Sequence, residues 1–213
     1  MSSLDELITK AKNLHSEGRS TSQIADEMSL SAETITWLLT QQKGEKAAPK
    51  DIVIDWSAIS SCSDTLHDAA AMLYKRYIHA LEAEVRDDED PCDKLPEVIV
   101  GVAHSGIPIA AMIAGEDPES RFTMFHPKKH ATGDNPTGSL NSSFADVAGK
   151  RCLIVDDVIT SGNTIKEAVE IIRSHNGTPV AVCVLFDKLG EKEVNAGGVK
   201  VPIYSLVRVS RID

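Results

Sequence analysis

Two adjacent carboxylates and a run of small polar residues stand together in LIVDDVITSGNT, at residues 153–164. Asp156 and Asp157 follow an unbroken apolar run, where like charges destabilise each other unless a partner accepts both. A divalent cation or the paired hydroxyls of a sugar would be such a partner. The segment Thr160–Thr164 then opens a helix with backbone N–H groups, hydroxyls and a glycine, which favours close approach of a phosphate. Together these groups predict a site for a phosphorylated ribose.

Each half of this pattern also has an ordinary explanation, as a helix cap or as a solvated strand end. Their order, directly after a buried strand, favours the ligand site. A Walker phosphate loop is excluded because the chain contains no GxxxxGK[ST] segment. A phospho-receiver domain would need its acid-bearing strand first and much more chain after it, whereas only 56 residues follow Asp157.

The elements that must position these groups alternate along the chain. Apolar runs predict strands at 97–102, 121–125, 151–156, 179–187 and 202–210, with a further short strand possible at 51–56. Helical spacing predicts helices at 64–85, from about 107, and at 164–175. Because the apolar runs are continuous, we expect an α/β fold with a mostly parallel sheet covered by helices on both faces. Ligands of such sheets bind beyond the carboxyl ends of the strands, where the two acids are expected.

The segment CLIVDDVITSGNT resembles the phosphoribosyl-pyrophosphate signature of the type I phosphoribosyltransferases, and its DDVxTSG core is closest to the orotate branch. The resemblance covers about residues 51–213 and implies the type I phosphoribosyltransferase fold. It implies that Asp156 and Asp157 hold the ribose hydroxyls, directly or through Mg²⁺ and water, without a tightly bound metal. It also implies that five residues cradle the 5′-phosphate: Thr160, Ser161, Gly162, Asn163 and Thr164.

The same family places a pyrophosphate loop after an earlier strand, and EVIVGVAHSGIPIA fits that position. The residues implied there are Ala103, His104, Ser105 and Gly106. His104 could equally be an ordinary exposed loop residue. A lone strand, turn and helix with one glycine is common, so its place before the acidic motif carries the assignment.

The segment of this chain that matches the catalytic loop of the orotate enzymes keeps only part of the pattern of that loop. That loop reads RKxxKxHG, and the matching segment here is MFHPKKHA. Lys128 and His130 match, while Met124 and Phe125 replace the Arg-Lys pair and Ala131 replaces the glycine. Since charge stabilisation is usually the largest catalytic contribution, we expect pyrophosphate contact from Lys128, Lys129 and His130 with little or no turnover. The alternative is a solvated basic loop.

A looser comparison concerns the segment that encloses orotate in those enzymes. IVIDWS keeps only its aspartate, Asp55, and has Ser57 where a cation would lie.

The first forty residues resemble the helix-turn-helix of transcription regulators. Three short helices are expected, with Ser20 and Ser31 capping the second and third. In such a module the third helix enters the DNA major groove. The DNA-contacting positions expected on it are Ser31, Ala32, Glu33, Thr34, Thr36 and Thr40. The alternative role is a dimerisation or packing appendage.

Composition limits the partners. The formal charge is -10, and residues 1–50 carry six Lys or Arg against seven Asp or Glu, so DNA contact must be local and is expected to need a homodimer or larger oligomer. Four widely spaced cysteines fit neither a zinc site nor a disulfide framework. No signal peptide or membrane span is evident, so a cytoplasmic protein is expected.

These features predict three regions: a helix-turn-helix domain at 1–42, a linker at 43–50 and a phosphoribosyltransferase-like domain at 51–213. This combination resembles the archaeal orotate phosphoribosyltransferase-like transcription regulators of sugar catabolism (GfcR type). We therefore expect a DNA-binding regulator that senses phosphoribosyl pyrophosphate or a related sugar phosphate. The alternative is an active orotate phosphoribosyltransferase in which Lys128 assists the departure of pyrophosphate.

Overall fold

The computed structural model describes residues 4–40, 49, 51–84, 94–131 and 137–210, which fall into two compact units, 1–58 and 59–213. The first unit contains three helices, α1 (Leu4–Ser16), α2 (Thr21–Glu27) and α3 (Ala32–Thr40). The expected linker, 43–50, lies outside the described residues except for Pro49. No strand forms at 51–56, so that expectation is wrong, and the single-turn helix α4 (Ser57–Ser60) follows. No helix among the described residues is long and apolar enough to span a membrane.

The second unit alternates strands and helices, largely as the apolar runs predict. Its helices are α5 (Ser63–Glu84), α6 (Gly106–Glu116) and α7 (Asn163–Ser174). Its strands are β1 (Val98–Val102), β2 (Arg121–His126), β3 (Ser139–Leu140), β4 (Arg151–Ile159), β5 (Thr178–Asp187), β6 (Glu193–Ala196) and β7 (Val199–Arg208).

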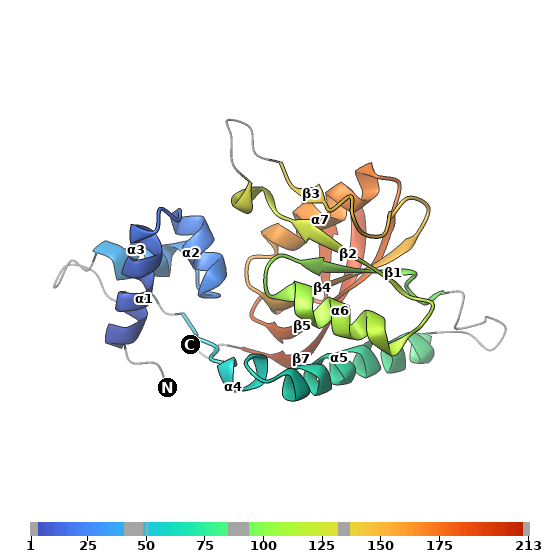
Figure 1. Cartoon of the computed structure of the whole chain (residues 1–213), viewed down its shortest axis with the longest axis horizontal. Helices are drawn as coiled ribbons and strands as arrows, with labels where there is room; N and C mark the ends of the chain where they lie inside the picture. Colours follow the sequence, from blue (N-terminus) through green and yellow to red (C-terminus); the bar gives the residue numbers. More distant parts are fainter. Residues whose placement is uncertain (1–3, 41–48, 50, 85–93, 132–136, 211–213) are drawn as a thin grey trace. The chain divides into compact units, whose positions relative to one another are not determined.

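The seven strands form one sheet in the order β3-β2-β1-β4-β5-β7-β6 (Figure 1). The five central strands are parallel, while β3 and β6 pair antiparallel at the two edges. The sequence analysis did not predict β6. Its signal was the Gly197-Gly198 pair between two short apolar runs, and both glycines have positive φ, as a two-residue hairpin turn requires. The predicted mostly parallel sheet is confirmed.

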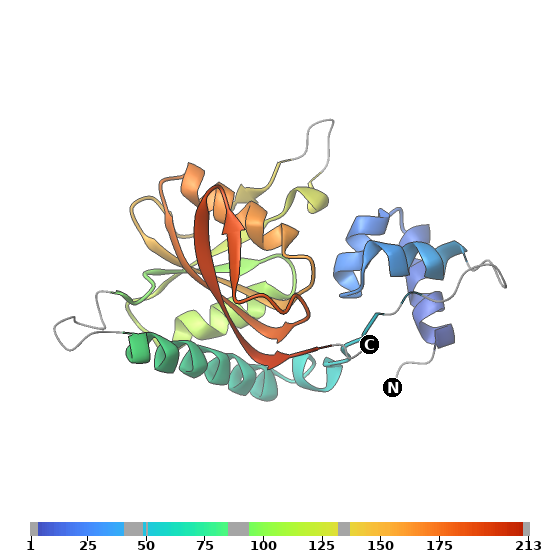
Figure 2. The ribbon, with the colours of Figure 1, turned by 180° about the vertical axis from the view of Figure 1, so that it is seen from behind.

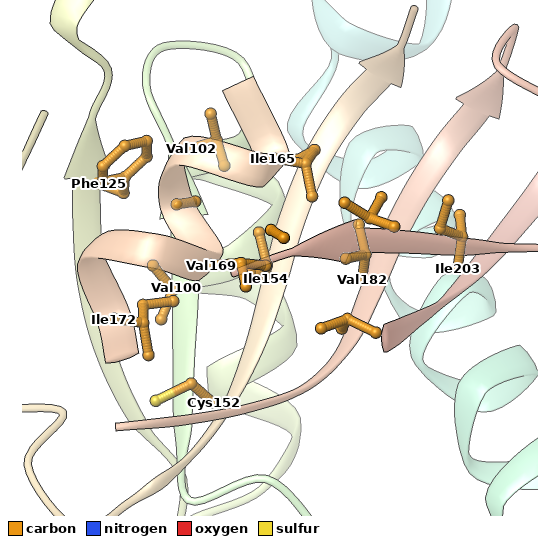
Figure 3. Close-up of a cluster of buried hydrophobic side chains, with 14 of the residues drawn as sticks. Val100, Val102, Phe125, Cys152, Ile154, Ile165, Val169, Ile172, Val182 and Ile203 are labelled. Atoms are coloured by element: carbon orange, nitrogen blue, oxygen red, sulfur yellow. The ribbon is translucent and has the colours of Figure 1, made fainter. Parts of the chain in front are cut away.

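Helices cover both faces of this sheet, with α7 on one face and α5 and α6 on the other (Figures 1 and 2). The α7 side is a core of branched aliphatic residues, in which Ile165, Val169 and Ile172 of the helix meet strand side chains such as Ile154 and Val182 (Figure 3). Burying each such side chain contributes about 1.5–3 kcal/mol. This double coverage explains why the central strands read as unbroken apolar runs.

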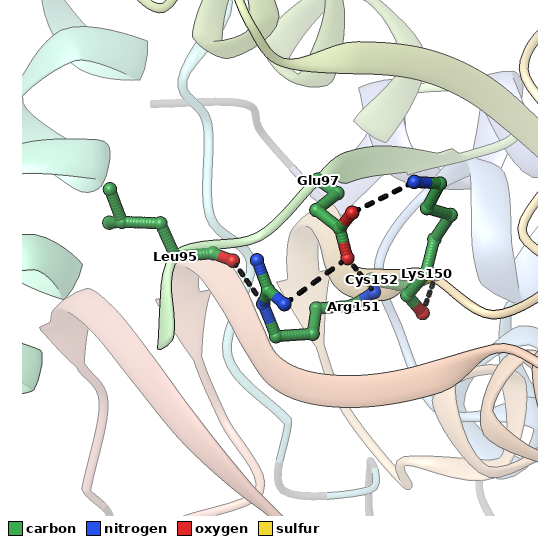
Figure 4. Close-up of polar contacts among 5 residues, drawn as sticks. All are labelled: Leu95, Glu97, Lys150, Arg151 and Cys152. Atoms are coloured by element: carbon green, nitrogen blue, oxygen red, sulfur yellow. Dashed lines mark hydrogen bonds and ion pairs between the residues drawn. The ribbon is translucent and has the colours of Figure 1, made fainter. Parts of the chain in front are cut away.

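A polar cluster fixes the amino ends of β1 and β4 (Figure 4). Glu97 Oε1 accepts a hydrogen bond from Lys150 Nζ at 2.9 Å, and Oε2 accepts one from the backbone N–H of Arg151 at 3.1 Å. These two bonds hold the pKa of Glu97 below its usual value. The Arg151 guanidinium also donates to the Leu95 carbonyl at 2.6 Å. The cluster aligns the two strands that carry the candidate site at their opposite ends.

Candidate functional site

The two adjacent acids lie inside β4 and not beyond its end. The strand continues to Ile159 because Asp156 pairs with Val184 and Ile159 with Asp187 of the long strand β5, so the strand end predicted at Asp156 is wrong. Successive strand side chains point to opposite faces, so the two carboxylates do not lie side by side. Asp157 is only 9% exposed, and Asp156 is half-buried. This arrangement suits contacts with separate groups of a ligand better than joint chelation of one ion.

Each of these carboxylates also accepts a hydrogen bond from the backbone N–H of the next residue. Asp156 Oδ1 accepts a hydrogen bond from the N–H of Asp157 at 2.9 Å, and Asp157 Oδ1 accepts one from the N–H of Val158 at 2.8 Å. A carboxylate oxygen accepts more than one hydrogen bond, so capacity for hydroxyls or water remains. The local bonds restrict the rotamers and so preorganise the acids.

The small polar segment after β4 forms the turn into α7. Gly162 has φ +73° and occupies the N-cap of the helix, a left-handed conformation that a side chain would strain. The helix begins at Asn163, one residue before the expected Thr164. Ser161 and Asn163 are exposed, while Thr160 and Thr164 are half-buried. The turn therefore presents hydroxyls and the positive end of α7 to solvent, as an anion site needs.

The predicted pyrophosphate loop forms the turn between β1 and α6. His104 and Ser105 are exposed, Ala103 is buried, and the helix begins at Gly106. A Cβ at Gly106 would overlap the carbonyl oxygen of Val155 and lie 2.9 Å from Cα of Asp156. The glycine thus allows α6 to start directly against the acid-bearing part of β4.

The basic segment after β2 contacts both of these turns. Lys128–His130 forms one 3-10 turn, in which Lys129 Nζ donates to Thr164 Oγ1 at 2.8 Å. The ring of His130 stacks on that of His104, with centroids 4.4 Å apart. The three segments that the sequence analysis assigned to one ligand therefore meet at the carboxyl ends of β1, β2 and β4.

Glu167 of α7 contacts the basic segment at this end of the sheet, and the sequence analysis did not identify it. Its Oε1 accepts a hydrogen bond from the backbone N–H of Lys128 at 2.9 Å. The two residues are 39 positions apart in the chain, so no local pattern could indicate the pairing. The bond anchors the start of the basic segment to α7.

Asp187, also missed, is a wholly buried acid at the carboxyl end of β5. Its Oδ2 accepts a hydrogen bond from Arg208 Nε at 2.9 Å, and its Oδ1 accepts one from the N–H of Gly190 at 2.8 Å. An acid directly after an apolar run was available as a signal in VLFDKLG. The ion pair joins the ends of β5 and β7 beside the end of β4.

The remaining positions singled out in the sequence are Asp55 with Ser57, and Met124 with Phe125. Asp55 accepts hydrogen bonds from the N–H and hydroxyl of Ser57, at 3.1 and 2.7 Å, which lower its pKa. Both belong to the first unit, and their bonds cap α4. Met124 and Phe125, at the positions of the missing Arg-Lys pair, are residues of β2, and Phe125 is wholly buried in the core.

The three helices of the first unit enclose their own apolar core, formed by eight buried residues: Ile8, Ala11, Leu14, Ile24, Met28, Leu30, Ile35 and Leu38. Ser20 caps α2 through a reciprocal capping box with Gln23. The three helices predicted from periodicity are therefore confirmed.

The third helix presents most of its predicted DNA-contacting positions to solvent. Ser31, Ala32, Glu33, Thr36 and Thr40 are exposed. The expected exposure of Thr34 is wrong, because its side chain is 8% exposed. Its hydroxyl is hydrogen-bonded to Ser31 Oγ at 2.8 Å and donates to Asp51 Oδ2 at 3.0 Å.

The described residues contain no cluster of three or more His, Cys, Asp or Glu side chains suited to holding a metal ion. Burial raises the pKa of the Cys152 thiol to about 12 and raises that of Cys183 as well. Cys62 is exposed, and hydrogen bonds from Thr65 and Asp64 lower its pKa. Cys92 lies outside the described residues.

Comparison with known proteins gives two kinds of match. Residues 64–203 match the family model of the phosphoribosyl transferase domain. The transcriptional regulator GfcR of Methanosphaerula palustris is 50% identical over 214 residues, covering 100% of both chains. The protein of that name from Methanospirillum hungatei is 51% identical over 213 residues, again covering 100% of both.

Solved structures are more distant in sequence. Orotate phosphoribosyltransferase from Aeropyrum pernix aligns with a TM-score of 0.55 and 20% identity, covering 79% of this chain and 83% of that one. The Mycobacterium tuberculosis orotate phosphoribosyltransferase in complex with inorganic phosphate aligns with a TM-score of 0.53 and 16% identity, covering 74% and 78%. These likenesses confirm the fold expected from the sequence.

Proposed function

The chain belongs to the phosphoribosyl transferase domain family and, over its whole length, to the family of relatives named transcriptional regulator GfcR, and from this we propose that it is a DNA-binding regulator that senses a phosphorylated ribose. The observation that carries the proposal is the joining of two units. A three-helix unit with exposed small polar residues on α3 precedes a sheet whose carboxyl edge gathers acids, hydroxyls and cations.

The proposed ligand is phosphoribosyl pyrophosphate or a related sugar phosphate, with Mg²⁺. The donor set fits it, because Asp156 and Asp157 are preorganised acceptors for ribose hydroxyls or for water on the ion. The turn Thr160–Thr164 offers N–H groups and hydroxyls to the 5′-phosphate. When bound, Mg²⁺ would neutralise part of the pyrophosphate charge.

The pyrophosphate itself would meet the turn Ala103–Gly106 and the basic segment Lys128–His130. Lys129 Nζ donates a hydrogen bond to Thr164 Oγ1, so one cation of the basic segment lies beside the proposed 5′-phosphate turn. The proposed function requires binding at this end of the sheet and does not require breaking the bond between the ribose C1 and the pyrophosphate.

One feature of the structure supports binding without rapid turnover. The positions that carry Arg and Lys in the catalytic loop of the orotate enzymes belong here to β2, where Phe125 is wholly buried. A cation at that position would be costly to bury, and the present side chain offers no charge to a departing pyrophosphate. An assay of orotate consumption with Mg²⁺ is expected to show no appreciable turnover. Robust turnover that disappears in Lys128→Ala would overturn this part of the proposal.

DNA recognition is assigned to α3. Five exposed positions from Ser31 to Thr40 offer hydroxyls, a methyl group and one carboxylate for contacts with base edges. Residues 1–50 carry only six Lys or Arg for contacts with DNA phosphates. One of them, Arg19, is already paired with Glu17 and Glu27 at 3.5 and 3.1 Å. We expect a dimer that presents two modules to two half-sites, which sedimentation with and without DNA would test.

The direct test is equilibrium binding to a duplex enriched by the wild-type chain from random-sequence DNA, with and without Mg²⁺ and phosphoribosyl pyrophosphate. Enrichment of a defined sequence and a ligand-dependent dissociation constant would support the proposal. Failure to enrich any sequence at modest salt in either condition would refute it. The ligand site is tested separately by calorimetry on the Asp156→Asn, Asp157→Asn double variant. Its affinity for phosphoribosyl pyrophosphate should fall by about tenfold or more, which is the loss expected for one charge-assisted hydrogen bond.

A further inference from the structure

The carboxylate of Glu167 lies where the end of β2 and the start of β3 come together. Its Oε1 accepts the hydrogen bond from the backbone N–H of Lys128 at 2.9 Å. A Cβ at Gly138, directly before β3, would lie only 2.6 Å from the same oxygen. Strands β2 and β3 pair antiparallel through His126 and Ser139, so the two segments lie side by side here. Glu167 therefore contacts both segments, one through a hydrogen bond and the other through close packing on its backbone.

Thr164 contacts the basic segment one turn earlier on α7. Its Oγ1 accepts the hydrogen bond from Lys129 Nζ at 2.8 Å. Residues three apart in a helix lie on the same face, so Thr164 and Glu167 present two hydrogen-bonding groups to the segment Lys128–His130. The hydroxyl takes a side-chain donor, whereas the carboxylate takes a backbone donor. The bond to Glu167 therefore fixes the course of the main chain from which the cations of the segment project.

A carboxylate at this place has two opposite effects on an anionic ligand. Its negative charge repels a pyrophosphate group bound by the segment Lys128–His130. Its hydrogen bond orders that segment in advance, which reduces the entropy lost when the ligand binds. Glu167 is half-buried, so the bond is partly shielded from water. The two effects are separable by substitution, because glutamine keeps an acceptor oxygen and lacks the charge.

We propose that Glu167 is a positioning residue of the ligand site, whose carboxylate oxygen holds the main chain at Lys128 so that the cations of the basic segment are in place before the ligand arrives. This inference rests on the proposed function, in which that segment meets the pyrophosphate. Glu167 acts through the segment and not by touching the ligand. An acid thus strengthens the binding of an anion through its acceptor oxygen, against the effect of its own charge.

The test measures the dissociation constant of phosphoribosyl pyrophosphate with Mg²⁺ by calorimetry on the full chain. Glu167→Ala should weaken binding by about threefold to tenfold, the range expected for the loss of one hydrogen bond. Glu167→Gln should bind at least as tightly as wild type, because its amide oxygen still accepts the Lys128 N–H and the repulsive charge is gone. Glu170→Gln is the matched control. It removes the same charge at an exposed position one turn further along α7 and should stay within about twofold of wild type.

Gly138→Ala disturbs the same hydrogen bond without altering Glu167. The added methyl would lie 2.6 Å from Glu167 Oε1 and 2.9 Å from the ring of Phe125, which is wholly buried. The carboxylate is the end of a flexible side chain, so it should shift and weaken its bond to Lys128. Affinity should then fall in Gly138→Ala, and should fall no further when Gly138→Ala is added to Glu167→Ala.

Hydrogen exchange of the Lys128 amide, followed by nuclear magnetic resonance without ligand, reports on the bond itself. Exchange should be faster in Glu167→Ala than in wild type, and slower again in Glu167→Gln. Far-ultraviolet circular dichroism would check folding, and the glutamine variant keeps the test decisive if the alanine variant unfolds.

The outcomes separate the inference from the proposed function. Wild-type affinity in Glu167→Ala, or a gain like that of Glu167→Gln, would show that the acceptor oxygen is not needed and would overturn the role of Glu167. An equal loss in both variants would also overturn it, because the charge would then be what matters. Each of these results leaves a ligand-binding regulator intact. Failure of wild type to bind phosphoribosyl pyrophosphate would overturn the ligand of the proposed function and this inference together.

Discussion

A methyl group at Gly106 is expected to destabilise the second unit and to weaken its ligand site. In Gly106→Ala the new Cβ would overlap the carbonyl oxygen of Val155 and lie 2.9 Å from Cα of Asp156. Both are backbone atoms of a central strand, so neither can move without disturbing the sheet. Overpacking of this kind typically costs about 1–3 kcal/mol. Because the strand is central, we expect about 2–3 kcal/mol, which corresponds to a fall of roughly 4–12 °C in Tm for a chain of this size.

The same helix supplies a matched control. Gly115 also belongs to α6, but a Cβ there would meet nothing within 4 Å. Gly115→Ala should raise stability by about 0.4–1 kcal/mol, because alanine restricts the unfolded chain. Urea unfolding followed by fluorescence and circular dichroism would measure both variants, and calorimetry would measure phosphoribosyl pyrophosphate binding. The close approach of α6 to β4 would be refuted if Gly106→Ala were as stable as Gly115→Ala.

Three further predictions concern the basic segment, the strand-end cluster and the thiols. Lys129→Met should weaken binding of inorganic pyrophosphate by about tenfold at low salt, with a smaller loss at high salt, and an equal loss at both would contradict an electrostatic role. Glu97→Gln should lower the free energy of unfolding at pH 7 by no more than about 1 kcal/mol, since the pair is partly exposed. Because the folded pKa of Glu97 is lowered, its stabilisation is present above the unfolded value of 4.5 and is lost as pH falls through the folded value. The difference in free energy of unfolding between Glu97→Gln and wild type, measured by urea titration, should therefore be larger at pH 7 than at a pH well below 4.5, and a difference that does not change with pH would contradict the prediction. Iodoacetamide followed by mass spectrometry should modify Cys62 in the native protein and leave Cys152 and Cys183 unmodified until urea unfolds it.

Local signals were sufficient for most elements of the fold. The capping box of Ser20 and Gln23, the helical spacing of α7 and the unbroken run before Asp156 each operate within a few residues. Such signals depend on propensity and periodicity, which the sequence displays directly. The edge hairpin of β6 was missed although the Gly197-Gly198 turn was visible, because the flanking runs are short.

The errors came from partners distant in sequence. Strand β4 extends past Asp156 because β5 continues to offer it hydrogen bonds. Thr34 is buried because Asp51 lies against it, and a helical wheel cannot include that neighbour. The segment 51–56 contains a short apolar run typical of a strand, but it pairs with no strand of the described sheet.

The sequence by itself determined the division into a helical and an α/β region and the type of sheet, since each follows from residue type and spacing. Only the tertiary structure decided which of these residues act together. It joined Lys129 to Thr164, stacked His130 on His104 and placed Gly106 against β4. The reason is that strand order and helix packing bring together groups that are far apart in the chain, through long-range burial that no short stretch of sequence encodes.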